Sequence, residues 1–236
     1  MRRSRQTLLA SICISFLFFV FNTSIQAESG SLSIGIYGSM LKTTGDIKAW
    51  YTTSPSFSGV LVYEFPRKRF QVETEINYTS FRDAGLQNRE FRWLITGERV
   101  KSPNAKASMG LTGITVNGVL NFTSSASSTF VPYLTVGIGF HRYKHSVSGL
   151  IWPGQLERPL DPMLLLPSYK DSGTGQSISI GCGISKYFSK RFVVDVRAQW
   201  RNFSEVVLRP LDAWELELFR SASGVQALLG FKYKVL

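Results

Sequence analysis

Cysteine and charged residues are both scarce in this sequence, and each shortage excludes a class of protein. Only Cys13 and Cys182 occur among 236 residues. Cys13 lies in the leader predicted below, so one thiol remains and a disulfide framework is excluded. Charged residues make up 18% and hydrophobic residues 44% of the chain. That composition is too apolar for an intrinsically disordered protein.

The sequence also lacks the common signatures of metal and cofactor sites. It has two histidines and no HExxH motif, which argues against a zinc centre. It has no phosphate-binding P-loop and no dinucleotide-binding glycine motif. We therefore expect neither a metal nor a cofactor.

The N-terminal segment has the three parts of a secretory signal peptide. Arg2, Arg3 and Arg5 precede an apolar run from Leu8 to Phe21, and a polar stretch leads to Ala27. A transmembrane helix needs about 20 residues, and this run is shorter. We predict a signal peptide over residues 1–27, with an uncleaved anchor helix as the alternative, and a single domain over residues 28–236. No later segment is long enough for a membrane helix, so any further crossing requires a closed barrel.

The excess of positive charge does not indicate nucleic acid. The formal net charge is +11, and removal of the three leader arginines gives 11 − 3 = +8. The basic residues are scattered along the chain instead of clustered. In an exported protein this favours anionic lipopolysaccharide as the partner of a basic surface.

Eight segments alternate apolar and polar residues with a period of two, as expected for strands between lipid and a polar lumen. In the third segment Val72 and Ile76 share one face, and Glu73 and Glu75 share the other. The eight segments are approximately 31–40, 57–65, 69–79, 108–122, 130–143, 175–188, 191–204 and 223–235.

The connections between these segments alternate between short and long. The short ones are 66–68, 123–129 and 189–190, and the long ones are 41–56, 80–107, 144–174 and 205–222. Outer-membrane barrels have short periplasmic turns, long outer loops and an even strand count. The pattern predicts an all-β fold, an eight-stranded antiparallel up-and-down transmembrane β-barrel, so residues 28–236 are predicted to form an outer-membrane β-barrel domain. The alternative is a soluble lipocalin-like barrel, which the many charges on one strand face disfavour.

A resemblance to known proteins rests on residues 131–140, on residues 183–188 leading into 191–197, and on the closing residues 229–233, and it extends over most of residues 30–236. These segments resemble the small outer-membrane β-barrel superfamily that includes outer membrane protein A and the opacity-type adhesins. The resemblance implies a location in a bacterial outer membrane and insertion by the barrel assembly machinery. Such barrels commonly end in Phe, whereas this chain ends in Lys234, Val235 and Leu236.

The polar face predicts a plugged lumen, because an eight-stranded barrel is just wide enough for side chains to fill and buried charges persist only in pairs. We expect strands three and seven to exchange ion pairs across the lumen. The alternative is a narrow channel for small solutes. The predicted salt-bridge network contains Glu73, Glu75, Asp195, Arg197, Arg201 and Lys232.

The long loops are predicted to carry the function, as a structural or surface-contact role. Trp152, Leu164 and Leu165 in the third loop and Trp214 in the fourth are the contact candidates. Two alternatives remain: the third loop folds over the barrel mouth, and the segment around Trp214 merely extends two strands. The expected partners are outer-membrane lipid, lipopolysaccharide (through the basic second loop) and a host or surface ligand, with no nucleic acid.

The runner-up function is a lipid A-modifying hydrolase. Some small barrels are deacylases with a His and a Ser near the outer end of one strand, and His141 and Ser146 lie in a comparable place here. Nucleophilic catalysis requires the base within hydrogen-bond reach of the hydroxyl. The neighbouring residues of the deacylase motif are absent, so we expect no enzyme activity.

Overall fold

The computed structural model describes residues 30–66, 69–123, 129–157 and 159–235. The predicted signal peptide, with Cys13, and parts of two short links (residues 67–68 and 124–128) lie outside the described residues. Within the described ranges, no helix is long and apolar enough to cross a bilayer.

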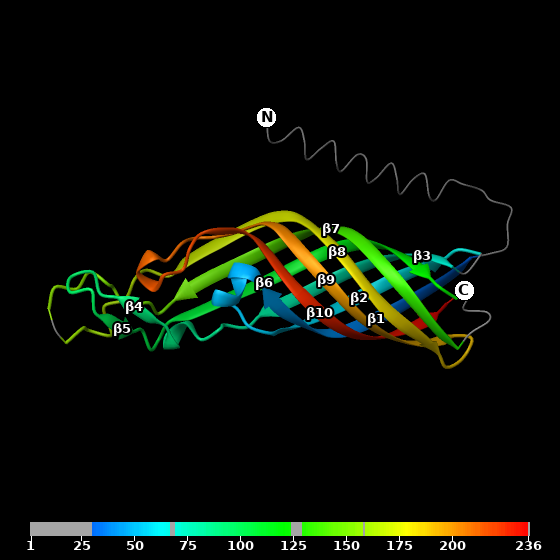
Figure 1. Ribbon diagram of the computed structural model, residues 1–236, viewed down its shortest axis with the longest axis horizontal. Coiled ribbons are helices and arrows are strands. Elements are labelled where there is room, and N and C mark those ends of the chain that lie inside the picture. Colours follow the sequence, from blue (N-terminus) through cyan, green and yellow to red (C-terminus); the bar gives the residue numbers. More distant parts are fainter. Residues whose placement is uncertain (1–29, 67–68, 124–128, 158, 236) are drawn as a thin grey trace, which may run out of the picture.

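Eight long antiparallel strands close into a barrel, which confirms the predicted fold class (Figure 1). The order around the barrel is β1-β10-β9-β8-β7-β6-β3-β2, so every long strand pairs with its neighbour in the chain. The first and last long strands also pair with each other, from Ser33–Lys234 to Thr44–Ser223. The long strands are β1 Ser31–Thr44, β2 Ser54–Glu64, β3 Phe70–Phe81, β6 Lys106–Asn121, β7 Phe130–Ser148, β8 Tyr169–Tyr187, β9 Phe192–Leu208 and β10 Phe219–Lys234.

The short and long connections lie at opposite ends of the barrel, and the described ends of the chain lie on the side of the short ones (Figure 1). A small hairpin, β4 Glu90–Arg92 with β5 Arg99–Lys101, occupies the second long connection. The long connections also contain short 3-10 turns: η1 Gly45–Ala49, η2 Leu86–Asn88 and η3 Asp212–Trp214. We call the end with the long connections the distal end.

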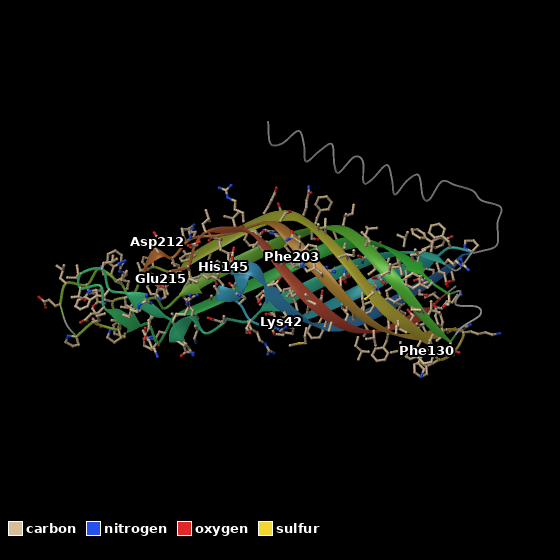
Figure 2. All side chains as sticks on the ribbon, viewed as in Figure 1. Lys42, Phe130, His145, Phe203, Asp212 and Glu215 are labelled. Carbon is tan, nitrogen blue, oxygen red and sulfur yellow. The ribbon has the colours of Figure 1, made fainter. Side chains whose placement is uncertain are left out.

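The outside of the barrel carries a continuous apolar belt. Each strand contributes large hydrophobic side chains that project outward, as the sticks in Figure 2 show between Phe130 near one end and Lys42 near the middle of the molecule. In water this much exposed apolar surface would be unstable, whereas acyl chains solvate it. Representative exposed belt residues, in order from β1 to β10, are Ile36, Leu61, Ile76, Val116, Ile138, Ile180, Val196 and Leu229.

Aromatic residues cluster at the short-turn rim of the belt. Phe188 and Phe192 are exposed, and the Phe192 ring lies 6.1 Å from that of Phe231. Phe65 and Phe70 form a second pair with ring centroids 5.6 Å apart. Aromatic rings of this kind concentrate at membrane interfaces.

Several strands continue beyond the belt with inverted polarity. On β7, Ile138 and Phe140 face outward within the belt, but the next outward residues are Arg142 and Lys144. On the inward side the change is opposite. Glycine and threonine face the lumen within the belt, whereas larger buried residues, beginning with Tyr143, face inward beyond it. The strand therefore leaves lipid for water without ending.

This inversion corrects the predicted strand limits. β7 extends to Ser148, beyond the predicted limit at residue 143, and β8 begins at Tyr169, ahead of the predicted residue 175. A search for an apolar outward face stops where that face turns polar, although the hydrogen-bonded ladder continues.

A β-bulge on β9 makes the same inversion possible in that strand. Phe203 faces inward on the odd-numbered face, but Val206 and Leu208 are buried on the even-numbered face. Glu205 between them has φ 60°, and the pairing with β10 changes register there. An extra residue in one strand shifts the alternation by one position, which turns the apolar residues inward above the belt.

Candidate functional site

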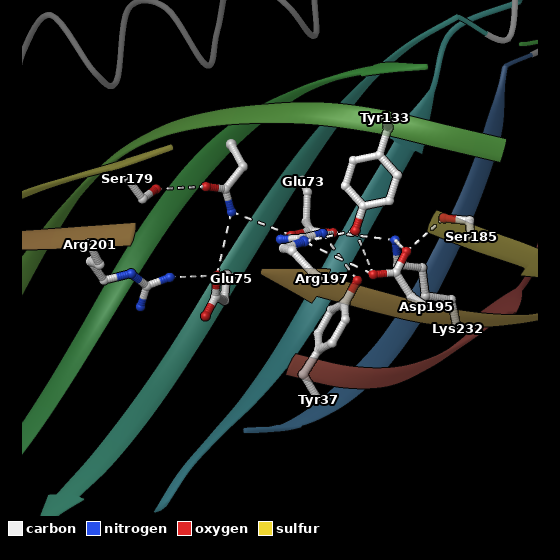
Figure 3. Close-up of polar contacts among 11 residues, drawn as sticks. Tyr37, Glu73, Glu75, Tyr133, Ser179, Ser185, Asp195, Arg197, Arg201 and Lys232 are labelled. Atoms are coloured by element: carbon white, nitrogen blue, oxygen red, sulfur yellow. Dashed lines mark hydrogen bonds and ion pairs between the residues drawn. The ribbon is translucent and has the colours of Figure 1, made fainter. Parts of the chain in front are cut away.

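Arg197 on β9 is the centre of a polar network that fills the barrel lumen (Figure 3). Its guanidinium donates to both carboxylate oxygens of Glu73 on β3, at 2.7 and 2.9 Å. It also donates to the hydroxyl oxygens of Tyr133 at 2.9 Å and Tyr37 at 3.1 Å. The side chains of Arg197 and Glu73 are both fully buried, and a bidentate pair is the geometry that best compensates such burial.

Asp195 extends the network toward the short-turn end. Its carboxylate accepts hydrogen bonds from the hydroxyl groups of Tyr133 and Ser185, each at 2.6 Å. The ammonium group of Lys232 lies 3.1 Å from the same carboxylate and 3.6 Å from Glu73. Lys232 therefore bridges two acids that would otherwise repel one another.

A second ion pair lies on the distal side of the first. Arg201 on β9 donates to Glu75 on β3 at 3.0 Å. The amide of Asn117 lies between the two layers, 3.4 Å from Glu73 and 3.5 Å from Glu75, and accepts from Ser179. The two layers thus form one connected set of contacts.

The six residues predicted for the lumen come together as three acids and three bases. Their formal charges cancel, so none of the six carries an uncompensated buried charge. Sequence reasoning missed the neutral members that complete the network, because tyrosine and serine on a strand face carry no charge signal. The six charged residues are Glu73, Glu75, Asp195, Arg197, Arg201 and Lys232.

Above the belt the barrel interior is an apolar core, which we call the distal core. Leu41, Leu111 and Tyr143 from the barrel wall pack there with Trp50 and Ile47 from the first long connection. The wall and the loops therefore enclose a second core, which is apolar inside and polar outside, as in a soluble protein.

Trp214 belongs to this core and not to the surface, which corrects its prediction as a contact residue. It is 2% exposed, and its ring stacks on Phe91 of β4 with centroids 4.7 Å apart. It ends η3, so the alternative that this segment extends β9 and β10 is also wrong at Trp214. The alternation around Trp214 reflects loop packing against the core.

His145 is buried in the same core. The Tyr51 hydroxyl contacts its Nδ1, and the rings of Trp50 and Tyr169 lie 5.3 and 6.0 Å from it. Burial lowers the pKa of His145 to about 4, although the Asp171 carboxylate acts in the opposite direction. His145 lies well beyond the belt, whose last outward residue on β7 is Phe140.

The second and third long connections join into one exposed apolar tip, which we define as Leu94, Ile95, Trp152, Leu156 and Met163–Leu165. All seven side chains are exposed, and those of Leu156 and Met163 are each 80% exposed. The alternative that the third loop folds over the mouth holds for part of the loop: Leu150 and Ile151 are buried in the distal core, and Leu160 and Leu166 pack against it. Trp152, Leu164 and Leu165 lie at the surface, as a contact role requires.

The residues of the alternative hydrolase do not form a catalytic pair. His141 faces the barrel interior and is buried, whereas Ser146 lies on the opposite face of β7 and exchanges a hydrogen bond with Ser108 at 2.9 Å. An odd separation along a strand divides two side chains in this way. Within the described ranges, no group of three His, Cys, Asp or Glu side chains is arranged to hold a metal.

Comparison with known proteins shows the fold. No protein family and no curated protein matches the sequence. A major outer membrane protein from Thermus thermophilus is similar in structure, with 8% identity, 86% of this chain and 98% of that chain covered, and a TM-score of 0.51. Neisserial surface protein A (14% identity, 87% and 99% covered, TM-score 0.48) and Ail of Yersinia pestis (18%, 87% and 97%, 0.43) also match. The likeness to the Thermus thermophilus protein and the apolar belt together identify the fold as that of a bacterial outer-membrane barrel.

Breaking the central ion pair is expected to destabilise the barrel. Glu73→Gln leaves the buried Arg197 without its carboxylate, and such a loss costs about 3–5 kcal/mol. Urea unfolding in detergent, followed by gel mobility of unheated samples, measures the change. The double variant Glu73→Gln/Arg197→Met should lose less stability than Glu73→Gln alone, while Glu217→Gln, at an exposed loop position, should change nothing. Equal stability of Glu73→Gln and the parent would contradict the network.

Acid is expected to loosen the distal core through His145. The pKa of this side chain is about 4 in the folded protein and about 6.5 in an unfolded chain, so the unfolded state binds the proton more tightly. The stabilisation is complete above pH ~6.5 and decreases toward pH ~4, by up to about 1.4 kcal/mol per unit. Hydrogen exchange of amides 47–51 at about pH 7.5 and about pH 4.5, on either side of the unfolded pKa, measures it. His145→Gln should show a smaller pH effect than the parent, and an equal effect would refute the assignment.

Proposed function

We propose that this protein is a non-enzymatic outer-membrane barrel with a sealed lumen, whose distal tip makes contacts at the cell surface. The observation that carries this proposal is the exposed apolar tip on a barrel wall that continues past the membrane belt. Exposed apolar clusters mark sites of interaction. The conclusion is a structural or adhesive role, exerted by the loops on a rigid support.

Main-chain and side-chain hydrogen bonds hold the tip in one arrangement. The Trp93 indole donates to the Gln155 carbonyl at 2.7 Å, and the Leu94 amide donates to the Pro153 carbonyl at 3.0 Å. In the third loop the Trp152 amide donates to the Leu164 carbonyl at 2.8 Å. A surface that is already ordered loses little conformational entropy when it binds a partner.

The filled interior argues against the channel as a function. The lumen contains the six-charge network in the belt and an apolar core above it. A solute would have to displace paired, fully buried charges to pass, which costs several kcal/mol for each ion. The separation of His141 from Ser146 argues in the same way against the hydrolase.

The partners proposed for this barrel follow from its surface. The apolar belt requires outer-membrane lipid, and the basic residues above it suit lipopolysaccharide phosphates. The alternate residues Leu229, Phe231, Tyr233 and Val235 of the last segment all project outward, a pattern suited to recognition by the barrel assembly machinery. A host or other surface ligand is proposed for the tip, and residues 1–27 are proposed as the export signal.

Purified protein in planar bilayers is expected to show no steady conductance, because paired side chains block the lumen. The variant Glu73→Ala/Arg197→Ala removes the central block and should increase the frequency of brief current steps. Single-channel recording at neutral pH compares the two proteins. Long, large openings of the unmodified barrel would overturn the sealed lumen and favour the solute channel.

Removal of the tip is expected to abolish adhesion without unfolding the barrel. The variant Trp152→Ser/Leu156→Ser/Met163→Ser replaces three exposed apolar side chains, and loss of contact residues of this kind lowers affinity about tenfold or more. Adherence of bacteria that display the protein to cultured epithelial cells and to hydrocarbon-coated glass measures the change.

The matched control for the tip variant is Leu218→Ser, an exposed apolar residue of the fourth loop outside the tip. It should adhere like the parent. Heat-modifiable gel migration of each variant confirms that the barrel is assembled. If the triple variant adheres as strongly as the parent on both surfaces, the tip is not the contact site.

A further inference from the structure

A groove of about 880 Å³ runs along the outside of the barrel where the belt meets the polar part of the wall. Its apolar floor contains Ile76, Ile114 and Phe140. These three residues lie side by side on β3, β6 and β7, because Ile76 pairs with Ile114 and Ile114 pairs with Phe140. The floor thus belongs to the acyl-chain zone of the membrane.

The distal wall of the groove is polar and basic. Arg142 and Lys144 line it, two and four residues beyond Phe140 on the same face of β7. Two residues of a strand span about 6.6 Å, so both cations lie at the depth of lipid headgroups. Both side chains are exposed, and within the part of the chain that the structure describes neither forms an ion pair or hydrogen bond with another side chain.

The neighbours of the two cations are small, so the charges remain accessible. Arg142 lies between Thr112 and Thr174 on the adjacent strands, and both of these line the groove. Lys144 lies between Gly110 and Ser172. A phosphate can therefore approach the guanidinium and the ammonium from the outside without displacing a bulky side chain.

Glu205 adds an acceptor to this basic wall. It lies at the β9 bulge and lines the same groove. A carboxylate repels a bare phosphate but accepts hydrogen bonds from hydroxyl groups. Together the groove contains an apolar floor, two cations for phosphate and an acceptor for sugar hydroxyls.

We propose that this groove binds one molecule of the phosphorylated glycolipid of the outer leaflet, lipid A. Its acyl chains lie along Ile76, Ile114 and Phe140, its phosphate contacts Arg142 and Lys144, and a sugar hydroxyl donates to Glu205. The inference rests on the proposed outer-membrane setting and gives the lipopolysaccharide interaction a specific site. It is independent of the adhesive tip.

The test is a titration of the full-length barrel in detergent micelles with defined lipids, read by native mass spectrometry. The probes are diphosphorylated lipid A, its fully dephosphorylated form and phosphatidylglycerol. The parent should bind diphosphorylated lipid A at least about tenfold more tightly than either other lipid, because two charge-assisted contacts and the sugar contact are combined.

The variant Arg142→Gln/Lys144→Gln should lose this preference, with affinity for diphosphorylated lipid A reduced about tenfold. The matched control is Lys42→Gln/Arg220→Gln, which removes two exposed cations from β1 and β10 on the opposite side of the barrel. The control should bind lipid A within about twofold of the parent. Heat-modifiable migration verifies that both variants are folded.

Three outcomes would overturn the groove: unchanged affinity of the Arg142/Lys144 variant, an equal loss in the control, or equally tight binding of phosphatidylglycerol. The first two would show that the groove is not the site, and the third that it does not select the glycolipid. The tip variant Trp152→Ser/Leu156→Ser/Met163→Ser should bind lipid A normally, so failure of the adhesion proposal and failure of this one are distinguishable.

Discussion

The ion pair between Arg197 and Glu73 joins opposite walls of the barrel. β9 and β3 are separated by three strands in either direction around the ring, and the parallel contact from Arg201 to Glu75 joins the same two strands. A membrane-spanning strand must turn its charges away from lipid, and the only place to turn them is the lumen. Once there, each charge needs a partner, and an eight-stranded barrel is narrow enough to place that partner on the far wall.

The same constraint explains the neutral side chains of the network. A guanidinium has five N–H groups, and Glu73 accepts two of its hydrogen bonds. Tyr37 and Tyr133 accept others, and their rings lie 5.1 and 5.4 Å from the guanidinium carbon. The tyrosines thus accept two of the three hydrogen bonds that the carboxylate leaves to the guanidinium, and their rings lie against its carbon.

The fold was predictable because its governing pattern is local. Lipid on one side and charge on the other impose a period of two on every strand, and Val72, Glu73, Glu75 and Ile76 display that period without reference to any other strand. The pairing of Glu73 with Arg197 followed from charge and the number of strands. The tyrosines that complete it were not predictable, because their role depends on the register between strands, which decides which side chains lie at the same level of the lumen.

The strand ends and Trp214 were not predictable for a related reason. Above the belt the solvent changes from lipid to water, so the meaning of an apolar residue reverses. An apolar outward residue such as Phe140 belongs to the belt, while apolar Val206 and Leu208 a few layers away face inward. Sequence reasoning that assigns apolar residues to one face therefore ends the strand too early at the boundary. It also places Trp214 on the surface, although this residue is buried in the core.

This boundary between lipid and water also sets where the functional features of the barrel lie relative to the membrane. On one face of β7, Phe140 is the last residue suited to acyl chains and Arg142 is the first suited to headgroups. The polarity inversion that lets the wall continue into water thus creates the junction of apolar floor and basic wall at which an anionic amphiphile fits. The continued wall then carries the apolar core that supports the tip. One change in the phase of alternation therefore connects lipid contact at the membrane with surface contact beyond it.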